Sequence, residues 1–421
     1  MKSTLRGPDG IVSEVRSGWL LIVAASVGVV TSSIVLPFYT IGALMKPLTL
    51  AFGWSRAEVQ YGILFSSGLG ALTAPVVGWL TDRYGPRALA LPGLIGLAVG
   101  FCIAGSMNGA LWMFFLAYGC MALLGAGTTP VTWTRAITTT FDKQRGLALG
   151  LTLTGTGICA MLAPLFTVRL IEAFGWRAAY FGIGALPILA WPIIWYGFRP
   201  PSPQARATQN ARLGLSAPVD WGFTLGESAR SYRFWVLCGS IWAVYMAVSG
   251  ISPNLIAALT DKGFSASSAA AAQGTYGLAI IIGRLGIGVL VDRFWAPGVG
   301  LVSLLLPALG CLILTSSASF AWVLLAAFMI GLAAGAELDL MAYLCSRYFG
   351  LRHYAKIYAV LYAILATASG TAPFLFAGVY DRTKSYRLSF IVATVLFLAG
   401  AVALPFLGRY PISRAPTPNV S

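Results

Sequence analysis

Residues 78–84 read GWLTDRY, and residues 288–294 read GVLVDRF. Each heptapeptide closes an apolar run with a glycine, an Asp-Arg pair and an aromatic residue at the same spacing. A motif repeated at the same place in two stretches of a chain is typical of an internal duplication. The two copies therefore predict a protein built from two similar halves.

The composition around these motifs indicates a membrane protein. Of the 421 residues, 58% are hydrophobic and only 10% are charged, and the mean hydropathy is +0.80. Soluble globular proteins carry roughly 25% charged residues, because their surface faces water. A chain with so few charges cannot cover a water-facing surface of this size. We therefore expect lipid to be the solvent for much of it.

The apolar runs predict an all-α membrane protein with twelve transmembrane helices in two pseudo-symmetric six-helix halves. A spanning helix needs about 20 mostly apolar residues. We expect a first half at 1–198, a cytoplasmic linker at 199–231, a second half at 232–408 and a cytoplasmic tail at 409–421. The expected spans are 18–44, 57–80, 88–107, 111–138, 146–171, 178–198, 232–259, 267–290, 298–317, 320–345, 354–379 and 386–408.

The distribution of basic residues predicts the orientation. Of the 28 Lys and Arg residues, eighteen fall in segments on the side of the N-terminus and eight on the opposite side. Cytoplasmic loops carry the excess of basic residues, so both termini are expected in the cytoplasm. The first apolar run is too long for the core of a signal peptide and should remain as a helix. We expect a multi-pass protein of the inner (plasma) membrane.

Several function classes find no support in the sequence. The net charge of +15 could suggest nucleic acid, but the basic residues lie in short segments between apolar runs and form no basic patch. The six cysteines lie in or beside apolar runs without metal-ligand spacing. His353 is the single histidine, so a Ser/His/Asp triad has no support. We expect no nucleic-acid partner, no metal, no cofactor and no enzyme activity.

The motif pair resembles the loop 2–3 signature of the major facilitator superfamily. The resemblance is carried by residues 78–87 (GWLTDRYGPR), and the second copy matches in part. Gly85 and Pro86 suit a tight turn. The resemblance implies a conformational latch; the alternative is a charge cluster that only fixes the topology. The latch residues would be Gly78, Asp82, Arg83, Gly85, Arg87, Gly288, Asp292 and Arg293.

A narrower resemblance points to the monocarboxylate and oxalate/formate transporters. It rests on the segments 141–150 (FDKQRGLALG), 174–177 (FGWR), 45–48 (MKPL) and 52–55 (FGWS). It implies transport of a small organic anion by alternating access with a proton as coupling ion. The sequence departs from these branches in two places. Ile280 stands where the monocarboxylate branch has an aspartate, and the eleventh span lacks the lysine of the oxalate branch.

Arg284 is the leading candidate for the substrate. It lies eight residues before Asp292, which places it ~12 Å from the end of its span. An ionisable residue at such depth is costly and is a functional candidate by default. A guanidinium can bind a carboxylate bidentately. The resemblance implies this role, and a structural ion pair between helices is the alternative.

Other polar residues in the spans are weaker candidates for contact with a bound anion. Arg135 can contact an anion or extend to the cytoplasmic surface. Tyr39, Asn254 and Tyr276 offer hydroxyl and amide groups, and ordinary packing is the alternative for each.

Glu337 and Asp339 are the candidates for proton coupling. Asp339 is eight residues before Arg347 and so lies at nearly the depth of Arg284. Two positions on a helix are separated by about 200°, so both acids cannot face one cavity. One acid should face Arg284 or carry a proton, while the other packs against a neighbouring helix.

The sequence therefore predicts a proton-coupled transporter of a small organic anion, a monocarboxylate in the first place, that works as a monomer. A drug or metabolite exporter is the second interpretation. Its support is reduced because Ala163-Pro164 stands where exporters often carry Gly-Pro. A membrane sensor that binds a solute without moving it is the third.

Overall fold

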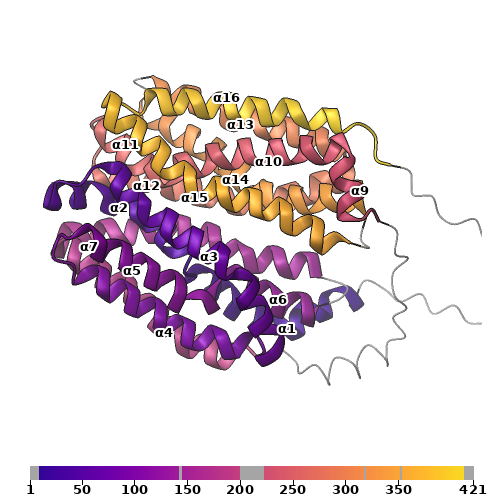
Figure 1. Cartoon of the computed structure of the whole chain (residues 1–421), viewed down its shortest axis with the longest axis horizontal. Helices are drawn as coiled ribbons and strands as arrows, with labels where there is room; N and C mark the ends of the chain where they lie inside the picture. The colour runs from indigo at the N-terminus through magenta and orange to yellow at the C-terminus, as the bar shows by residue number, and fades with distance from the viewer. Residues whose placement is uncertain (1–8, 142–144, 200–221, 317–318, 351–352, 412–421) are drawn as a thin grey trace, which may run out of the picture. The chain divides into compact units, whose positions relative to one another are not determined.

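A computed structural model of the chain describes residues 9–141, 145–199, 222–316, 319–350 and 353–411, and these form an all-α protein (Figure 1). The described residues fall into two compact units. One comprises those within Met1–Leu213 together with Ser252–Leu278, and the other those within Gly214–Ile251 and Ala279–Ser421. The long helices of each unit run side by side (Figure 1).

The first unit holds the N-terminal helices and a segment from the middle of the chain. Its elements are α1 (Asp9–Val30), α2 (Val35–Phe52), α3 (Arg56–Tyr84), α4 (Pro86–Gly105), α5 (Leu111–Leu124), η1 (Ala126–Thr128), α6 (Pro130–Thr140), α7 (Arg145–Gly197), η2 (Ser252–Asn254), α11 (Leu255–Asp261) and the beginning of α12 (Ala266–Arg293).

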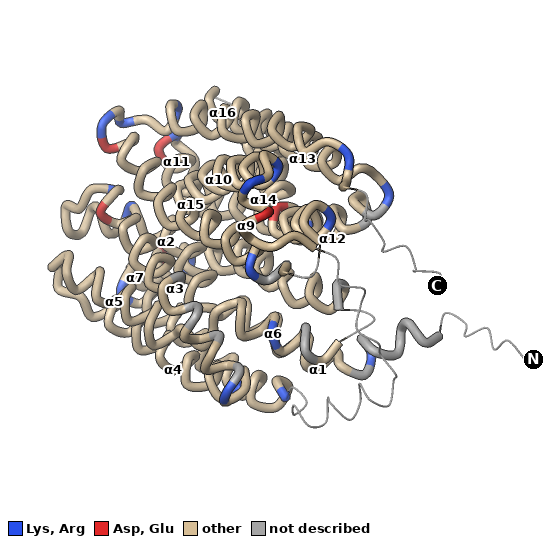
Figure 2. Tube along the Cα trace, turned by 45° about the vertical axis from the view of Figure 1, so that its right-hand side comes forward, with Lys and Arg blue, Asp and Glu red and all other residues tan. Residues whose placement is uncertain are grey.

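The second unit holds the C-terminal helices. Its elements are α9 (Leu225–Arg230), α10 (Tyr232–Ile251), the remainder of α12, α13 (Ala296–Thr315), α14 (Phe320–Phe349), α15 (Tyr354–Thr383), α16 (Arg387–Ala403) and η3 (Leu404–Leu407). Many of the lysine and arginine positions (blue) and the aspartate and glutamate positions (red) lie near helix ends. Long stretches of the helices between them carry no charged residue (Figure 2).

The helices confirm the predicted fold class. Eight helical segments of the described chain are long and apolar enough to cross a membrane, and α5 is a shorter apolar helix. Several predicted spans consist of more than one element. The first is α1 and α2, interrupted at residues 31–34; the fourth is α5, η1 and α6; the seventh is α10, η2 and α11. The predicted domain limits stay a prediction, and most of the predicted linker lies outside the described residues.

Glycines with positive φ angles turn the chain at three corners of the first unit. Gly85 has a φ of 85° and ends α3, and Pro86 is the first residue of α4, which confirms the predicted turn. Gly175 has a φ of 82° and separates two spans within α7. Gly53 ends α2 in the left-handed conformation, with a φ of 72°. Positive φ angles favour glycine, because a Cβ atom is strained there.

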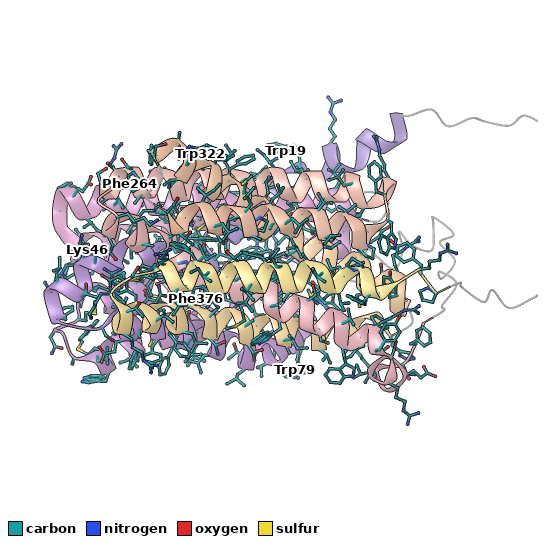
Figure 3. The ribbon with its side chains drawn as sticks, turned by 90° about the horizontal axis from the view of Figure 1, so that it is seen from above. Trp19, Lys46, Trp79, Phe264, Trp322 and Phe376 are labelled. Carbon is teal, nitrogen blue, oxygen red and sulfur yellow. The ribbon has the colours of Figure 1, made fainter. Side chains whose placement is uncertain are left out.

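Large apolar side chains cover the outside of the helices, as lipid contact requires. Trp19 and Trp79 project outward from the first unit and Trp322 from the second (Figure 3), and each is more than half exposed. The inside of the first unit holds a separate cluster of buried apolar side chains around Trp133 and Phe198. Lipid tails are as apolar as the inside of the helix bundle, so apolarity alone does not hold the helices together. Close packing between the helices must do so.

Two glycines bring α12 and α14 into backbone contact beside Arg284. A Cβ atom on Gly335 would lie 2.2 Å from the carbonyl oxygen of Ile280. A Cβ atom on Gly283 would lie 2.2 Å from the carbonyl oxygen of Leu332. Real Cβ atoms do not approach backbone so closely, so only glycine fits at either position. The close approach fixes the spacing of the two helices that carry Arg284, Glu337 and Asp339.

We predict that Gly335→Val destabilises the protein by about 1–3 kcal/mol, because the added side chain must push α12 away. The measurement is the free energy of unfolding in detergent. Gly378→Val in α15 is the matched control, since a Cβ atom there meets nothing within 4 Å. Equal effects of the two substitutions would contradict a tight contact between α12 and α14.

Candidate functional site

Arg284 is buried in the second unit with donors to spare. Its exposed fraction is 4%, and among the described residues its Nε and Nη1 atoms have no hydrogen-bond partner. The nearest acid is Asp339, whose Oδ1 atom lies 3.9 Å from Nη1. That distance is too long for a hydrogen bond. The guanidinium therefore has an ionic neighbour and still keeps donors that an anion can use.

Asp339 and Glu337 face different surroundings, as their helical separation predicted. Asp339 forms the loose ion pair with Arg284 and its side chain is 35% exposed. Glu337 is 7% exposed and lines a cavity of about 30 Å³ between α10, α13 and α14. Apart from Ser240 and Tyr245, the other residues of this cavity are apolar. Neither carboxyl oxygen of Glu337 has a hydrogen-bond partner among the described residues.

Two tyrosines that the sequence interpretation missed lie near these charges, and a third lies beside them. Tyr245 of α10 lies within electrostatic reach of Glu337 and Arg284, and Tyr358 of α15 within reach of Asp339 and Arg284. Tyr362 lies one helical turn after Tyr358 and close to Tyr245. Tyrosines four residues apart on one apolar helix share a face. The spacing of Tyr358 and Tyr362 in the sequence indicates that they share a helix face. It does not reveal which charged residues lie near that face.

The remaining candidates for substrate contact belong to the first unit. Asn254 is buried, and its Oδ1 atom accepts a hydrogen bond from Nε2 of Gln60 at 3.3 Å. Tyr276 is buried in the first part of α12. Tyr39 is partly buried on α2 and its ring lies 5.1 Å from that of Phe38. The structure brings Asn254 together with Gln60, and the substrate role of all three residues stays a prediction.

Arg135 lies in the middle of α6 and is exposed, and its role stays a prediction. The latch residues lie toward helix ends. Arg87 donates a hydrogen bond to the carbonyl oxygen of Trp195 at 2.8 Å and stacks on its ring. Arg83 lies 5.5 Å from the ring centroid of Tyr84.

The side chains of Asp82 and Asp292 lie outside the described part. Gly78, Gly288 and Arg293 lie near the ends of α3 and α12, as predicted. The latch role of these residues stays a prediction.

One protein family matches nearly the whole chain. The model of the Major Facilitator Superfamily matches residues 20–248 and 237–421. The chain belongs to the major facilitator superfamily. It is therefore a multi-pass membrane transporter of this family, and its interior charges belong to a protein that moves a solute.

Individual relatives support the family at low identity. Human monocarboxylate transporter 11 is 24% identical over 410 residues, which cover 94% of this chain and 82% of the relative. The MFS transporter asaE of Aspergillus flavus is 25% identical over 406 residues, covering 93% and 87%.

Among solved structures, a bacterial homologue of the human lysosomal transporter Spinster, in an inward-facing and occupied conformation, matches with a TM-score of 0.68. It has 19% identity, with 94% of this chain and 97% of that chain covered. At this identity the match shows the fold alone.

We predict that Arg284 and Asp339 are only weakly coupled. A double-mutant cycle with Arg284→Ala, Asp339→Ala and both together should give a coupling energy of about 1 kcal/mol or less in unfolding. The reason is the 3.9 Å separation of the charged atoms. A coupling of about 3 kcal/mol or more, as in tight buried ion pairs, would favour the structural alternative for Arg284.

Proposed function

We propose that this transporter moves a small organic anion, in the first place a monocarboxylate, together with a proton by alternating access. The observation that supports the proposal is the state of Arg284. A buried guanidinium whose Nε and Nη1 atoms lack hydrogen-bond partners among the described residues suits a carboxylate. The similarity to monocarboxylate transporter 11 over most of the chain supports the same class of cargo.

Arg284 would hold the carboxylate of the cargo by paired hydrogen bonds and by charge. Asp339 is near enough to attract the guanidinium and too far to occupy its donors. An arriving carboxylate can therefore take the donors without first displacing a tight partner. Among the described residues of the second unit, Arg284 is the one buried arginine. Helix α15 carries no lysine or arginine between Tyr358 and Ala377 that could act as a second cation. A monoanion fits one cation better than a dianion does.

Glu337 would carry the coupled proton. An ionised carboxylate without a partner in apolar surroundings is costly, whereas the neutral acid is tolerated. Both oxygens of Glu337 are buried in such surroundings. A proton bound there removes one negative charge from the interior while the anion adds one. The loaded carrier then reorients with little change in net buried charge.

The proposed setting is the inner (plasma) membrane with both termini in the cytoplasm. The excess of basic residues in the segments on the terminal side supports this orientation. We propose that the protein acts as a monomer and that its partners are the anion, the proton and the bilayer.

We predict that Arg284→Ala abolishes uptake of the transported carboxylate. The measurement is uptake of a panel of radiolabelled carboxylates into proteoliposomes with an imposed pH gradient. Arg284→Lys should lower uptake by about 10-fold or more, because an ammonium cannot reproduce the bidentate geometry. Arg169→Ala is the matched control, since Arg169 is an exposed arginine of α7 and should leave uptake unchanged.

The outcomes distinguish the rival functions. Unchanged uptake in Arg284→Ala would contradict the substrate role of Arg284. Absence of carboxylate uptake under every gradient, with efflux of other metabolites, would replace the proposal by an exporter. Binding without counterflow would replace it by a sensor.

We predict that Glu337→Gln uncouples transport from protons. The amide resembles the neutral acid in shape and charge, so the loaded carrier should still reorient. Exchange of labelled for unlabelled cargo should therefore persist, while accumulation driven by a pH gradient is lost. Glu172→Gln is the matched control. Glu172 is an exposed acid of α7 near Gly175, where the first of the two spans in α7 ends. Full acid-driven accumulation in Glu337→Gln would contradict the proton role.

A further inference from the structure

A cavity of about 520 Å³ lies between α2, α7, α11 and the beginning of α12. All of its lining residues belong to the first unit, whereas Arg284 and Glu337 belong to the second. Apart from Lys46, Glu172 and Thr260, the lining side chains are apolar or aromatic. Pockets that hold small molecules have volumes of about 300–1,000 Å³. This cavity is therefore large enough for a ligand that is mostly apolar and carries a charged part.

The polar groups of the cavity lie at one end of it. On each of three helices, a polar lining residue follows a small or apolar one by four positions: Gly42 and Lys46 on α2, Val168 and Glu172 on α7, and Ile256 and Thr260 on α11. Residues four positions apart share a helix face and lie about 6 Å apart along the axis. In each pair the polar residue is the nearer one to the end of its helical span. The cavity is thus polar at its mouth and apolar at its floor.

The depth of the two charges matches the boundary between lipid heads and lipid tails. Lys46 lies six residues before the end of α2, and Glu172 lies three residues before the corner at Gly175. These separations correspond to ~9 Å and ~5 Å along the helices, and the headgroup region of one leaflet is about 5–8 Å thick. Leu50, which also lines the cavity, is 78% exposed, as suits an apolar side chain beside lipid.

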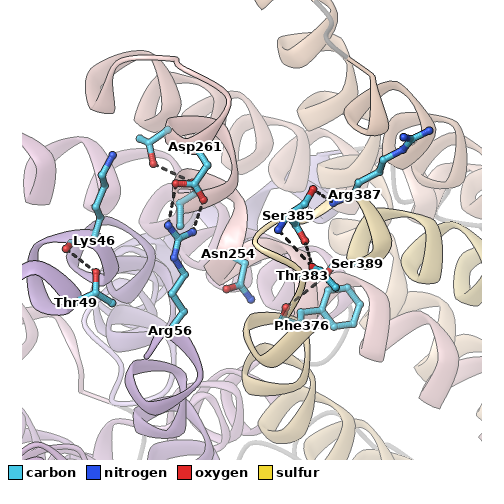
Figure 4. Close-up of polar contacts among 12 residues, drawn as sticks. Lys46, Thr49, Arg56, Asn254, Asp261, Phe376, Thr383, Ser385, Arg387 and Ser389 are labelled. Carbon is cyan, nitrogen blue, oxygen red and sulfur yellow. Dashed lines mark hydrogen bonds and ion pairs between the residues drawn. The ribbon is translucent and has the colours of Figure 1, made fainter. Parts of the chain in front are cut away.

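Lys46 and Glu172 do not neutralise each other. Both side chains are exposed, and neither forms an ion pair among the described residues. The contact of Lys46 in Figure 4 uses its backbone carbonyl oxygen, which accepts a hydrogen bond from the hydroxyl of Thr49 at 2.9 Å. Asp261, at the end of α11, is already held by both terminal nitrogens of Arg56, with 2.8 Å between Nη2 and Oδ1 (Figure 4). The cavity therefore offers a ligand one cation and one anion.

We propose that this cavity binds a phospholipid with an ethanolamine headgroup. The phosphate of the lipid pairs with the ammonium of Lys46, and the ammonium of the lipid donates hydrogen bonds to the carboxylate of Glu172. An acyl chain lies along the floor beside Gly42 and Val168. A glycerol head would leave Glu172 without a cation, and a choline head has no N–H group to donate. The inference goes beyond the proposed function and does not depend on the class of cargo.

The test uses the full-length protein in nanodiscs of a choline phospholipid, without cargo or gradient. Each sample contains a small fraction of a probe phospholipid whose acyl chain carries a diazirine and whose head is ethanolamine, choline or glycerol. Irradiation links the probe to residues that contact its chain, and mass spectrometry of the digested protein locates the links. The ethanolamine probe should label the segments 168–176 and 256–260 about 5-fold or more above the other two, because only its head satisfies both charges with N–H donors.

Two variants separate the roles of the charges. Lys46→Ala should lower labelling of these segments by the ethanolamine probe about 5-fold or more, because the phosphate loses its cation. Glu172→Gln should remove the preference, so that the ethanolamine and glycerol probes label the segments equally. A change that only disturbed the structure would lower labelling by every probe and keep their ratio. Arg169→Ala is the matched control, since Arg169 is an exposed cation of α7 outside the cavity lining, and it should leave the labelling unchanged.

Three results would overturn the inference: equal labelling by the three probes in the parent protein, unchanged labelling in Lys46→Ala, or a preserved preference in Glu172→Gln. Stronger labelling by a diazirine fatty acid than by every phospholipid probe would also overturn it and assign the cavity to a single-chain acid. Failure of carboxylate uptake would overturn the proposed cargo and leave these labelling results as they stand.

Discussion

Every backbone N–H and C=O group inside a bilayer must find its partner within the protein, because lipid offers none. This constraint explains why the described chain is almost entirely helical and why its corners fall at glycines such as Gly85 and Gly175. It also makes each helix break informative. At the break in the first span, the backbone N–H of Ser33 donates to the hydroxyl of Thr128 at 2.9 Å, next to the break in the fourth span. The break in the fourth span thus supplies an acceptor for a backbone donor at the break in the first span, inside one unit.

Helices that already satisfy their own backbone can associate only by packing closely or by sharing polar groups. The second unit uses both devices at one place. Gly283 and Gly335 let α12 and α14 touch backbone to backbone, and the same contact lies beside Arg284. This approach fixes the backbone positions from which Arg284 and Asp339 extend, and their charged atoms lie 3.9 Å apart.

The sequence was sufficient for the fold class because hydropathy acts locally along the chain. It also predicted the depth of Arg284 and Asp339 by counting residues to a charged helix end, and that depth stays a prediction. It could not give the neighbours of Glu337, because helical periodicity tells which residues share a face and not which helix covers that face. Arg56 and Asp261 were missed for the same reason. They are separated by 205 residues, and each alone resembles an ordinary loop charge.

The two ion pairs differ in a way that suits two different tasks. Arg56 and Asp261 fill each other's hydrogen-bonding positions, so the contact is strong when made and costly when half of it is removed. Arg284 and Asp339 attract each other across a gap and leave donors unfilled. A saturated pair can hold two helices together but has little to offer a solute. An unsaturated pair contributes little to stability but can bind an anion without first being broken. The difference between the two pairs therefore supports the proposal that Arg284 binds the cargo, because its donors remain available.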